Sequence, residues 1–506
     1  MNRNGVSSAL PPDAILRNPA GFAADRYDLI AVGGGIYGIM TALEAVRRGL
    51  SVLLLERDDF GARTSTGHLR ILHGGLRYLQ SLDLERHRDS VGERNWFLRH
   101  FPGLTRSMNC LMPLYGDGLR HPWAFRAAFA LDAWLARDRN HGLDPDHRLE
   151  AGRVLSPRET ADRFPGVDPR GLRGGAFWQD GFAPDAPRLP IELLRWACAF
   201  GARALNHCRA DELIRDGDQT AGVRATDLAD GTIHEFHAPT VVNAAGPWCR
   251  NFAGICDRDR PELFPGAVLA WNLLMDRPPL AACAVAAAPR RRGARTWFFP
   301  PWKGRMLVGT GEAPLATGEE PRPPRPSEID GMLADLNAAL PELRFRRDEI
   351  RRVFWGAIPA DTPGRPSGHP VVVDHGCDGG PKGFHSVSGV KFTTARQVAD
   401  RILGRIFPDL VPRPYDAAFA PSPLHGRRGL EPASDRIESW RVLAREESAL
   451  SLADLMLRRS DLADRAPLSA ETLSGLAGIF PEAESTQVET LRRILTEGLP
   501  RSDGAP

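Results

Sequence analysis

Short, fully apolar runs alternate with amphipathic stretches near the start of the chain. Residues 27–32 (YDLIAV) and 51–56 (SVLLLE) are apolar runs that predict two buried strands. Between them, residues 39–48 carry apolar side chains at helical spacing and are followed by Gly49, a common helix end. The pattern therefore predicts a strand–turn–helix–strand unit with a right-handed crossover.

Similar patterns return far downstream in the chain. Residues 241–248 (VVNAAGPW) predict a buried strand that leaves into a glycine turn, and residues 296–310 predict a hairpin that turns at 300–304. Two more short strands are predicted at 370–374 and 384–387. Helical spacing predicts four further helices, at 83–100, 188–201, 329–340 and 393–407.

Three regions have other patterns. Residues 106–170 are mixed and rich in turns, and residues 313–327 are dense in proline, glycine and charge, which predicts a surface loop. After a proline-rich stretch at 408–423, residues 430–500 predict a helical tail.

Composition narrows the class of protein. The chain has 506 residues, which favours two or three domains. Its formal net charge is +2, and it lacks the concentrated basic face or tail that is typical of a nucleic-acid partner. The seven cysteines form no C-x-x-C pair and are odd in number, which argues against a disulfide framework and a metal site and favours a reducing compartment.

The sequence also bears on the membrane. Residues 1–26 lack the apolar segment of a signal peptide, and no uncharged apolar run reaches the roughly 18 residues of a membrane span. We therefore expect a cytoplasmic protein. A peripheral contact with the inner face of the membrane and a homodimer both stay open.

The most specific motif is Gly33-x-Gly35-x-x-Gly38, which follows a strand and opens a helix. Gly33 permits the tight turn, Gly35 lets the backbone approach a pyrophosphate, and Gly38 allows close helix–strand packing. Glu56 ends the second strand, where it would accept hydrogen bonds from ribose hydroxyls. The motif does not itself distinguish FAD from NAD. The distant nucleotide-fold pieces at 241–248 and 384–407 favour a flavoprotein with an inserted substrate domain.

Several segments together resemble the FAD-dependent glycerol-3-phosphate dehydrogenase family, within the wider group of D-amino-acid-oxidase-like flavoproteins. Besides Gly33–Gly38 and Glu56, the resemblance rests on Thr64-Ser65-Thr66, HGGLRYL at 73–79, VNAAGPW at 242–248, Pro301-Trp302 with Gly309-Thr310, GVKFTT at 389–394 and LADLMLRR at 452–459. The HGGLRYL and K-x-T-T segments are the specific ones, because the glycine motif is shared by many flavoproteins.

The resemblance implies an α/β fold with an interrupted Rossmann-like FAD-binding domain, a substrate domain with an antiparallel sheet and a C-terminal helical cap. The predicted FAD-binding parts are 25–105, 171–255 and 360–410; the substrate domain is 106–170 and 256–359; the cap is 411–506.

The resemblance also implies site residues around FAD. Thr64 and Ser65 would hold pyrophosphate and flavin, while Gly74 and Gly75 would let the backbone approach the flavin ring. The segment with Gly389, Lys391, Thr393 and Thr394 would bring an ammonium and a helix N-terminus to the reduced flavin, whose negative charge both stabilise.

The catalytic candidates are His73, Arg77, Tyr78 and Lys391. Arg77 and Tyr78 would face the substrate, where an arginine can bind an anion bidentately. His73 and His385 are candidate proton acceptors. The predicted function is oxidation of a CH–OH group of a small alcohol by hydride transfer to FAD, with electrons passed to a quinone or another acceptor. An amine or amino-acid oxidase, and a flavin-binding protein without catalysis, stay open as alternatives.

Three positions depart from the family pattern on the substrate side. Ile358 stands where the family carries an arginine, Val268 stands at the place of a histidine, and Arg70 replaces a lysine of the first flavin loop. Because a buried phosphate needs charged partners, these replacements predict a substrate other than glycerol 3-phosphate. The alternative that Arg352 or Arg365 takes the place of the missing arginine stays open.

Overall fold

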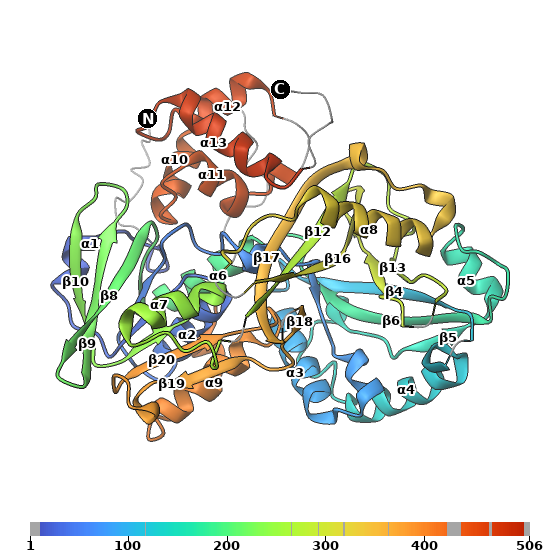
Figure 1. Cartoon of the computed structure of the whole chain (residues 1–506), viewed down its shortest axis with the longest axis horizontal. Coiled ribbons are helices and arrows are strands. Elements are labelled where there is room, and N and C mark those ends of the chain that lie inside the picture. Colours follow the sequence, from blue (N-terminus) through green and yellow to red (C-terminus); the bar gives the residue numbers. More distant parts are fainter. Residues whose placement is uncertain are drawn as a thin grey trace, which may run out of the picture.

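The computed structural model describes residues 11–116, 118–264, 266–291, 293–316, 319–362, 364–421, 437–464 and 468–499. Parts of the predicted cap, at 422–436, 465–467 and 500–506, lie outside the described residues. The described chain forms two large sheet regions side by side, with a cluster of C-terminal helices (red in Figure 1) above them.

The first region is built on a six-stranded sheet in the order β19-β20-β11-β1-β2-β7. Neighbouring strands run parallel except for β19 and β20. The strands are β1 (Leu29–Val32), β2 (Val52–Leu55), β7 (Arg203–Leu205), β11 (Val241–Asn243), β19 (Val371–Asp374) and β20 (Phe384–Ser388). The sheet therefore combines strands from the beginning of the predicted nucleotide-binding sequence, β1 and β2, with strands from its end, β19 and β20.

Both faces of this sheet are covered, which explains why its strands are apolar throughout. Leu29 and Ala31 face one core, which is closed by α2 (Ile36–Val46), α6 (Arg188–Ala199) and α9 (Ala395–Ile406). Ile30 and Val32 face the other core. An antiparallel sheet of β8 (Cys208–Asp216), β9 (Gln219–Asp227) and β10 (Ile233–His237), together with α7 (Cys249–Cys256), closes that side.

The second region is an eleven-stranded, largely antiparallel sheet. Its main path runs β18-β17-β12-β16-β14-β13-β4-β6-β3, with β15 on β16 and β5 on β6. The strands are β3 (Ile71–Leu72), β4 (Arg106–Leu114), β5 (Arg153–Leu155), β6 (Gly174–Phe182), β12 (Ala267–Met275), β13 (Ala284–Ala287), β14 (Trp297–Phe299), β15 (Pro301–Trp302), β16 (Arg305–Leu315), β17 (Ile350–Thr362) and β18 (Arg365–Pro366). Helix α8 (Pro326–Ala339) packs on one of its cores, and α4 (Pro122–Leu135) packs on another.

Most predicted elements are present, including the hairpin at 296–310 and α3 (Leu84–His100). Helix α2 starts at Ile36 instead of the predicted residue 39, because the last motif glycine lies inside its first turn. The mixed region 106–170 contains two helices that the pattern did not resolve, α4 and α5 (Pro157–Arg163). Helix α4 combines alanines with aromatic residues on more than one face, so its periodicity is weak.

The domain boundaries stay a prediction. The two sheets divide the chain in nearly the same places, with β1 and β2 in one sheet and β12, β16 and β17 in the other. Strand β6 lies in the eleven-stranded sheet, although its residues fall in the range 171–255 that was assigned to the FAD-binding part.

The C-terminal helices pack around a core of their own. They are α10 (Ile437–Glu446), α11 (Leu452–Asp454), the π-helix η11 (Leu455–Arg459), α12 (Ala470–Ala477) and α13 (Glu484–Thr496). The π-helix brings the neighbouring side chains of Arg458 and Arg459 to the same carboxylate, that of Asp59 just after β2. Burial alone would raise the pKa of Asp59, but the two arginines lower it below its ordinary value.

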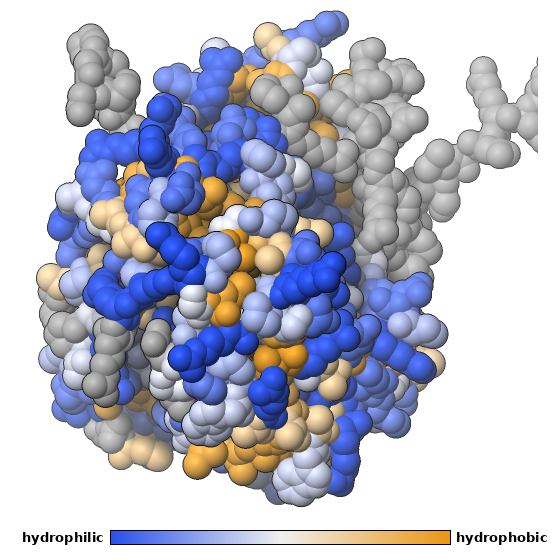
Figure 2. All heavy atoms as spheres, turned by 90° about the vertical axis from the view of Figure 1, so that its right-hand side faces the viewer, coloured by the Kyte–Doolittle hydropathy of each residue, from blue (hydrophilic) through white to orange (hydrophobic). Residues whose placement is uncertain are grey.

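None of the helices in the described ranges is long and apolar enough to cross a membrane. Hydrophobic residues nevertheless reach the surface in patches on the side that carries α4 and α5 (Figure 2). On α4, Trp123 is 62% exposed and Trp134 is 63% exposed.

Candidate active site

A cavity of about 1500 Å³ lies between the two sheet regions and is lined by residues of both. Pockets for a single small ligand usually measure about 300–1,000 Å³, so this cavity has room for a dinucleotide and a substrate together. One end lies against the glycine motif and Glu56, and the other reaches the 3-10 helix η2 (Leu76–Ser81) and α4.

The glycine motif forms a cradle that no larger residue could occupy. Gly33 has φ +105°, and a Cβ there would lie 2.6 Å from the Ala244 carbonyl oxygen. A Cβ on Gly38 would lie 1.8 Å from the Gly33 carbonyl oxygen. Gly35 is the N-cap of α2 and lines the cavity, so the N–H groups of the first helical turn face the space that a pyrophosphate would fill. The residues present therefore fit a dinucleotide cofactor.

Glu56 lies beside this cradle at the end of β2. Its carboxylate accepts hydrogen bonds from the backbone N–H of Gly34 at 2.5 Å and of Asp58 at 2.7 Å. Burial raises the pKa of Glu56 to about 7, with Asp58 adding to the effect. Hydroxyl donors from a ribose would lower that pKa again, because they favour the charged carboxylate.

The rim near Glu56 is closed by a residue from the other sheet region. Glu320 accepts hydrogen bonds from Trp248 Nε1 and from Asn251 Nδ2, each at 2.7 Å. The Arg57 guanidinium lies 4.5 Å from the Trp248 ring centroid. Trp248, Asn251 and Glu320 all line the cavity, so the segment after β16 reaches across to the nucleotide end.

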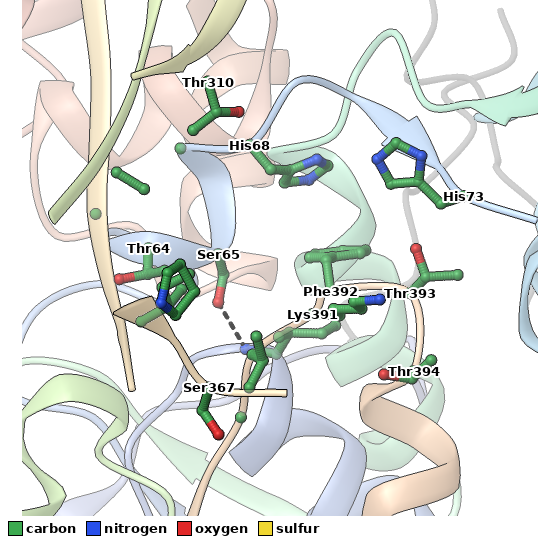
Figure 3. Close-up of a pocket in the computed structure, with 18 of the residues that line it drawn as sticks. Thr64, Ser65, His68, His73, Thr310, Ser367, Lys391, Phe392, Thr393 and Thr394 are labelled. Carbon is green, nitrogen blue, oxygen red and sulfur yellow. Dashed lines mark hydrogen bonds between the residues drawn. The ribbon is translucent and has the colours of Figure 1, made fainter. Parts of the chain in front are cut away.

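Thr64 and Ser65 lie on the 3-10 turn η1 (Thr64–Thr66), where they join separate elements. The Ser65 hydroxyl accepts a hydrogen bond from the Ile36 N–H at 2.8 Å, drawn as the dashed line in Figure 3. Thr64 donates to the Ala357 carbonyl oxygen and accepts from the Ala357 N–H, both at 3.1 Å. The two residues therefore tie the start of α2 to β17 across the cavity.

Tyr37, inside the glycine motif, holds the segment that carries Lys391. Its phenol donates to the Lys391 carbonyl oxygen at 2.9 Å. The ring lies so close to Gly389 that a Cβ there would be 1.6 Å from a ring carbon. Gly389 is therefore required by packing, and the nucleotide motif fixes the position of Lys391. An aromatic side chain inside the motif was the signal that could have suggested this role.

The four catalytic candidates gather at the cavity. His73, Arg77, Tyr78 and Lys391 all line it, and Lys391 Nζ lies 4.0 Å from the Tyr78 ring centroid. Burial, with a smaller contribution from the nearby Arg77, lowers the pKa of Lys391 to about 8. The His73 ring opens onto the cavity, but the surrounding protein desolvates it and lowers its pKa.

The glycine pair before η2 is constrained by the protein behind it. Gly75 has φ +79°, and a Cβ there would lie 2.8 Å from the Ser90 side chain. The Gly74 N–H donates to Asp180 Oδ1 at 2.6 Å. These contacts direct η2, and with it Arg77 and Tyr78, into the cavity.

Thr393 and Thr394 line the cavity at the start of α9, near Lys391 (Figure 3). Thr394 is the N-cap residue, but its hydroxyl makes no capping hydrogen bond. The backbone N–H groups of this turn therefore stay available. His385 lies on β20 with its Nδ1 3.7 Å from Asp374 Oδ1, and it is not among the described residues that line the cavity.

The prediction missed His68, which lies at the centre of the cavity wall (Figure 3). Its ring centroid is 4.6 Å from that of Phe392, and its Nδ1 accepts a hydrogen bond from the Arg70 N–H at 3.1 Å. Burial holds the pKa of His68 well below its ordinary value, with Arg70 and His73 adding to the effect. The ring is therefore neutral, with its proton on Nε2. Only its place in a polar loop could have drawn attention to it.

The three positions that depart from the family pattern lie in two separate places in the structure. Val268 on β12 and Ile358 on β17 are cross-strand partners, so the two apolar replacements stand directly opposite each other. Arg70 is fully buried, donates to the carbonyl oxygens of Thr66 and His68 at 2.5 and 2.8 Å, and lies over the Phe354 ring at 4.4 Å. Its guanidinium is therefore used within the protein.

Known proteins that are similar to this chain include several glycerol-3-phosphate dehydrogenases. The glycerol-3-phosphate dehydrogenase of Synechocystis sp. is 30% identical over 78% of this chain and 72% of its own length. The mitochondrial glycerol-3-phosphate dehydrogenase of Arabidopsis thaliana is 29% identical over 75% of this chain and 61% of its own length. The glycerol-3-phosphate dehydrogenase structure from Bacillus halodurans, a complex with FAD, superimposes with a TM-score of 0.68 at 20% identity, covering 96% of this chain and 98% of that one.

The sequence model of the FAD dependent oxidoreductase family, DAO, matches residues 28–401. That range includes the glycine cradle, Glu56, η2 and the Lys391 segment. The chain therefore belongs to the DAO family of FAD-dependent oxidoreductases, and its cofactor is FAD.

Proposed function

We propose that this enzyme oxidises a CH–OH group of an alcohol bound between η2 and the Lys391 segment. The observation that carries the proposal is the cluster of His73, Arg77, Tyr78 and Lys391 at the cavity, next to the start of α9. The glycerol-3-phosphate dehydrogenases to which the chain is similar support an alcohol donor and a separate electron acceptor, a quinone or another oxidant.

FAD, when bound, supplies the two-electron acceptor for the hydride that leaves the alcohol carbon. Its nucleotide half would be held by the glycine cradle and Glu56, and its flavin half by the segments of Thr64, Ser65 and Lys391. The assignment of the six-stranded sheet to the cofactor and the eleven-stranded sheet to the substrate belongs to the same proposal.

The side chains of the cluster have distinct tasks in this proposal. His73, kept neutral by its lowered pKa, accepts the hydroxyl proton as the hydride leaves. The Lys391 ammonium stabilises negative charge that develops beside it, an effect that is large where water is excluded. Arg77 forms no ion pair with a carboxylate among the described residues, so its guanidinium is available to a polar or anionic part of the substrate.

The cavity wall argues against glycerol 3-phosphate as the natural substrate. Val268 and Ile358 place an apolar cross-strand pair where the resemblance implies polar side chains. Ile358 lines the cavity, and a phosphate against its side chain would lose hydration without gaining a partner at that position. Arg365 lines the same cavity, so a phosphate would have to be held by that arginine or by the cations of the cluster.

An anaerobic titration of the FAD-loaded enzyme tests the proposed function. Bleaching of the oxidised flavin absorbance by alcohols is the expected result. Flavin that stays oxidised with every alcohol but bleaches with amines or amino acids would replace the proposal with the amine-oxidase alternative. Peripheral membrane contact and a homodimer stay predictions.

A further inference from the structure

The cavity continues beyond the catalytic cluster into a branch that runs along α4. The branch starts at η2, which carries Arg77 and Tyr78 and packs against α4. It is lined by Leu79, Met112, Ala124, Ala127, Ala128 and Leu131.

The sequence of α4 explains why this branch is open and apolar. Phe125 and Phe129 turn into the core of the eleven-stranded sheet. Ala124, Ala128 and Leu131 follow at four- and three-residue spacing, so they share the adjacent helix face. Because two of these three are alanines, the space beside the helix is not filled by the helix itself.

None of the six residues named along the branch carries a charge. Arg86, at its edge, forms an ion pair with Asp83 at 2.6 Å and lies 2.9 Å from His369 Nε2. The cations of the cluster, Arg77 and Lys391, are at the inner end, on η2 and before α9. A ligand that fills the whole branch would thus be polar at one end and apolar along the rest.

We propose that the substrate is an alcohol with a hydrocarbon arm, whose hydroxyl-bearing end lies at the cluster and whose arm lies along α4. This inference rests on the proposed function and specifies its substrate class. The same geometry explains the apolar pair Val268 and Ile358, because an uncharged substrate needs no arginine at that wall.

A chain-length series on the FAD-loaded enzyme tests the inference without any substitution. Glycerol, 1-O-butylglycerol and 1-O-octylglycerol would be mixed anaerobically with the enzyme, and the rate of flavin reduction divided by the dissociation constant would be measured. Each methylene group that enters the branch is expected to raise this ratio about threefold to fourfold, until the branch is full. A ratio that does not change with chain length would overturn the inference and leave the proposed function standing.

A pair of variants tests whether the hydrocarbon arm of the substrate lies along α4. Ala128→Phe fills the branch and is expected to lower the ratio for 1-O-octylglycerol at least tenfold relative to glycerol. Ala130→Phe is the matched control, because Ala130 lies on the same helix, is exposed and is not among the residues lining the cavity. An unchanged chain-length dependence in Ala128→Phe, with bound flavin retained, would contradict the assignment.

Two other outcomes are distinguishable. If Ala128→Phe slows only the reoxidation of reduced enzyme by a short-chain quinone, the branch serves the electron acceptor and the inference is wrong. If glycerol and its ethers leave the flavin oxidised while another alcohol reduces it, the inference is wrong and the proposed function stands; if no alcohol reduces the flavin while FAD binds normally, the proposed function itself fails.

Discussion

The two ends of the cavity are built in opposite ways. At the nucleotide end, the glycine motif and Glu56 come from one continuous segment, where backbone contacts such as Gly38 against Gly33 leave no space for larger side chains. The substrate end is assembled from η2, α4, β12 and β17, and its character depends on side chains such as Ile358, whose cross-strand partner Val268 is buried behind it. The first end is fixed by sterics and the second by side-chain identity, so a chain can keep its cofactor while its substrate changes.

The substitution with the largest expected effect tests the nucleotide end of the cavity, which is fixed by sterics. Gly38→Ala would force a methyl group against the Gly33 carbonyl, which we expect to weaken FAD binding about 100-fold, corresponding to about 3 kcal/mol of overpacking. The flavin content after gel filtration and the FAD dissociation constant would be measured. Gly92→Ala is the control, because a Cβ at Gly92 meets nothing within 4 Å. Normal FAD affinity in Gly38→Ala would show that sterics do not fix this end.

Substitutions of Lys391 test the place where the nucleotide end and the substrate end of the cavity meet. Removing the ammonium in Lys391→Met is expected to slow flavin reduction about 100-fold, the usual cost of losing one electrostatic contact in an excluded site. Because burial lowers the pKa of Lys391 to about 8, the wild-type rate should fall as pH rises through about 8. Lys391→Arg keeps its charge at high pH, so its profile should lack that fall. A wild-type rate that is flat from pH 7 to 9 would contradict the role of the ammonium.

The substitution with the smallest expected effect tests the substrate end of the cavity. Ile358→Arg restores a cation to the cavity wall and is expected to raise the efficiency of flavin reduction by glycerol 3-phosphate about tenfold, as one charge-assisted hydrogen bond would give. The same variant should lose efficiency with 1-O-octylglycerol. Rapid reduction of the wild-type flavin by glycerol 3-phosphate would instead show that the apolar wall does not exclude the phosphate.

The sequence predicted the nucleotide end of the cavity better than the substrate end. The glycine motif, Glu56 and the helix after Lys391 could be identified because their geometry is local, and each was found in the cavity wall. The α4 branch could not be predicted, since it depends on how a weakly periodic helix packs on a distant sheet. The pairing of Val268 with Ile358 depends on the register between two strands, which the sequence of neither strand reveals.

Asp59 links the first part of the chain to its last, and this has a consequence for biosynthesis. The carboxylate follows the strand that presents Glu56, yet one of its two arginine partners, Arg459, lies 400 residues later in the chain. At a translation rate of about 5–20 residues per second, that partner leaves the ribosome about 20–80 s after Asp59. During that interval the buried Asp59 carboxylate lacks both of its arginine partners. The contact between Asp59 and the C-terminal helices is therefore among the last to form, and a chain that stops before residue 458 would leave this carboxylate without its arginines.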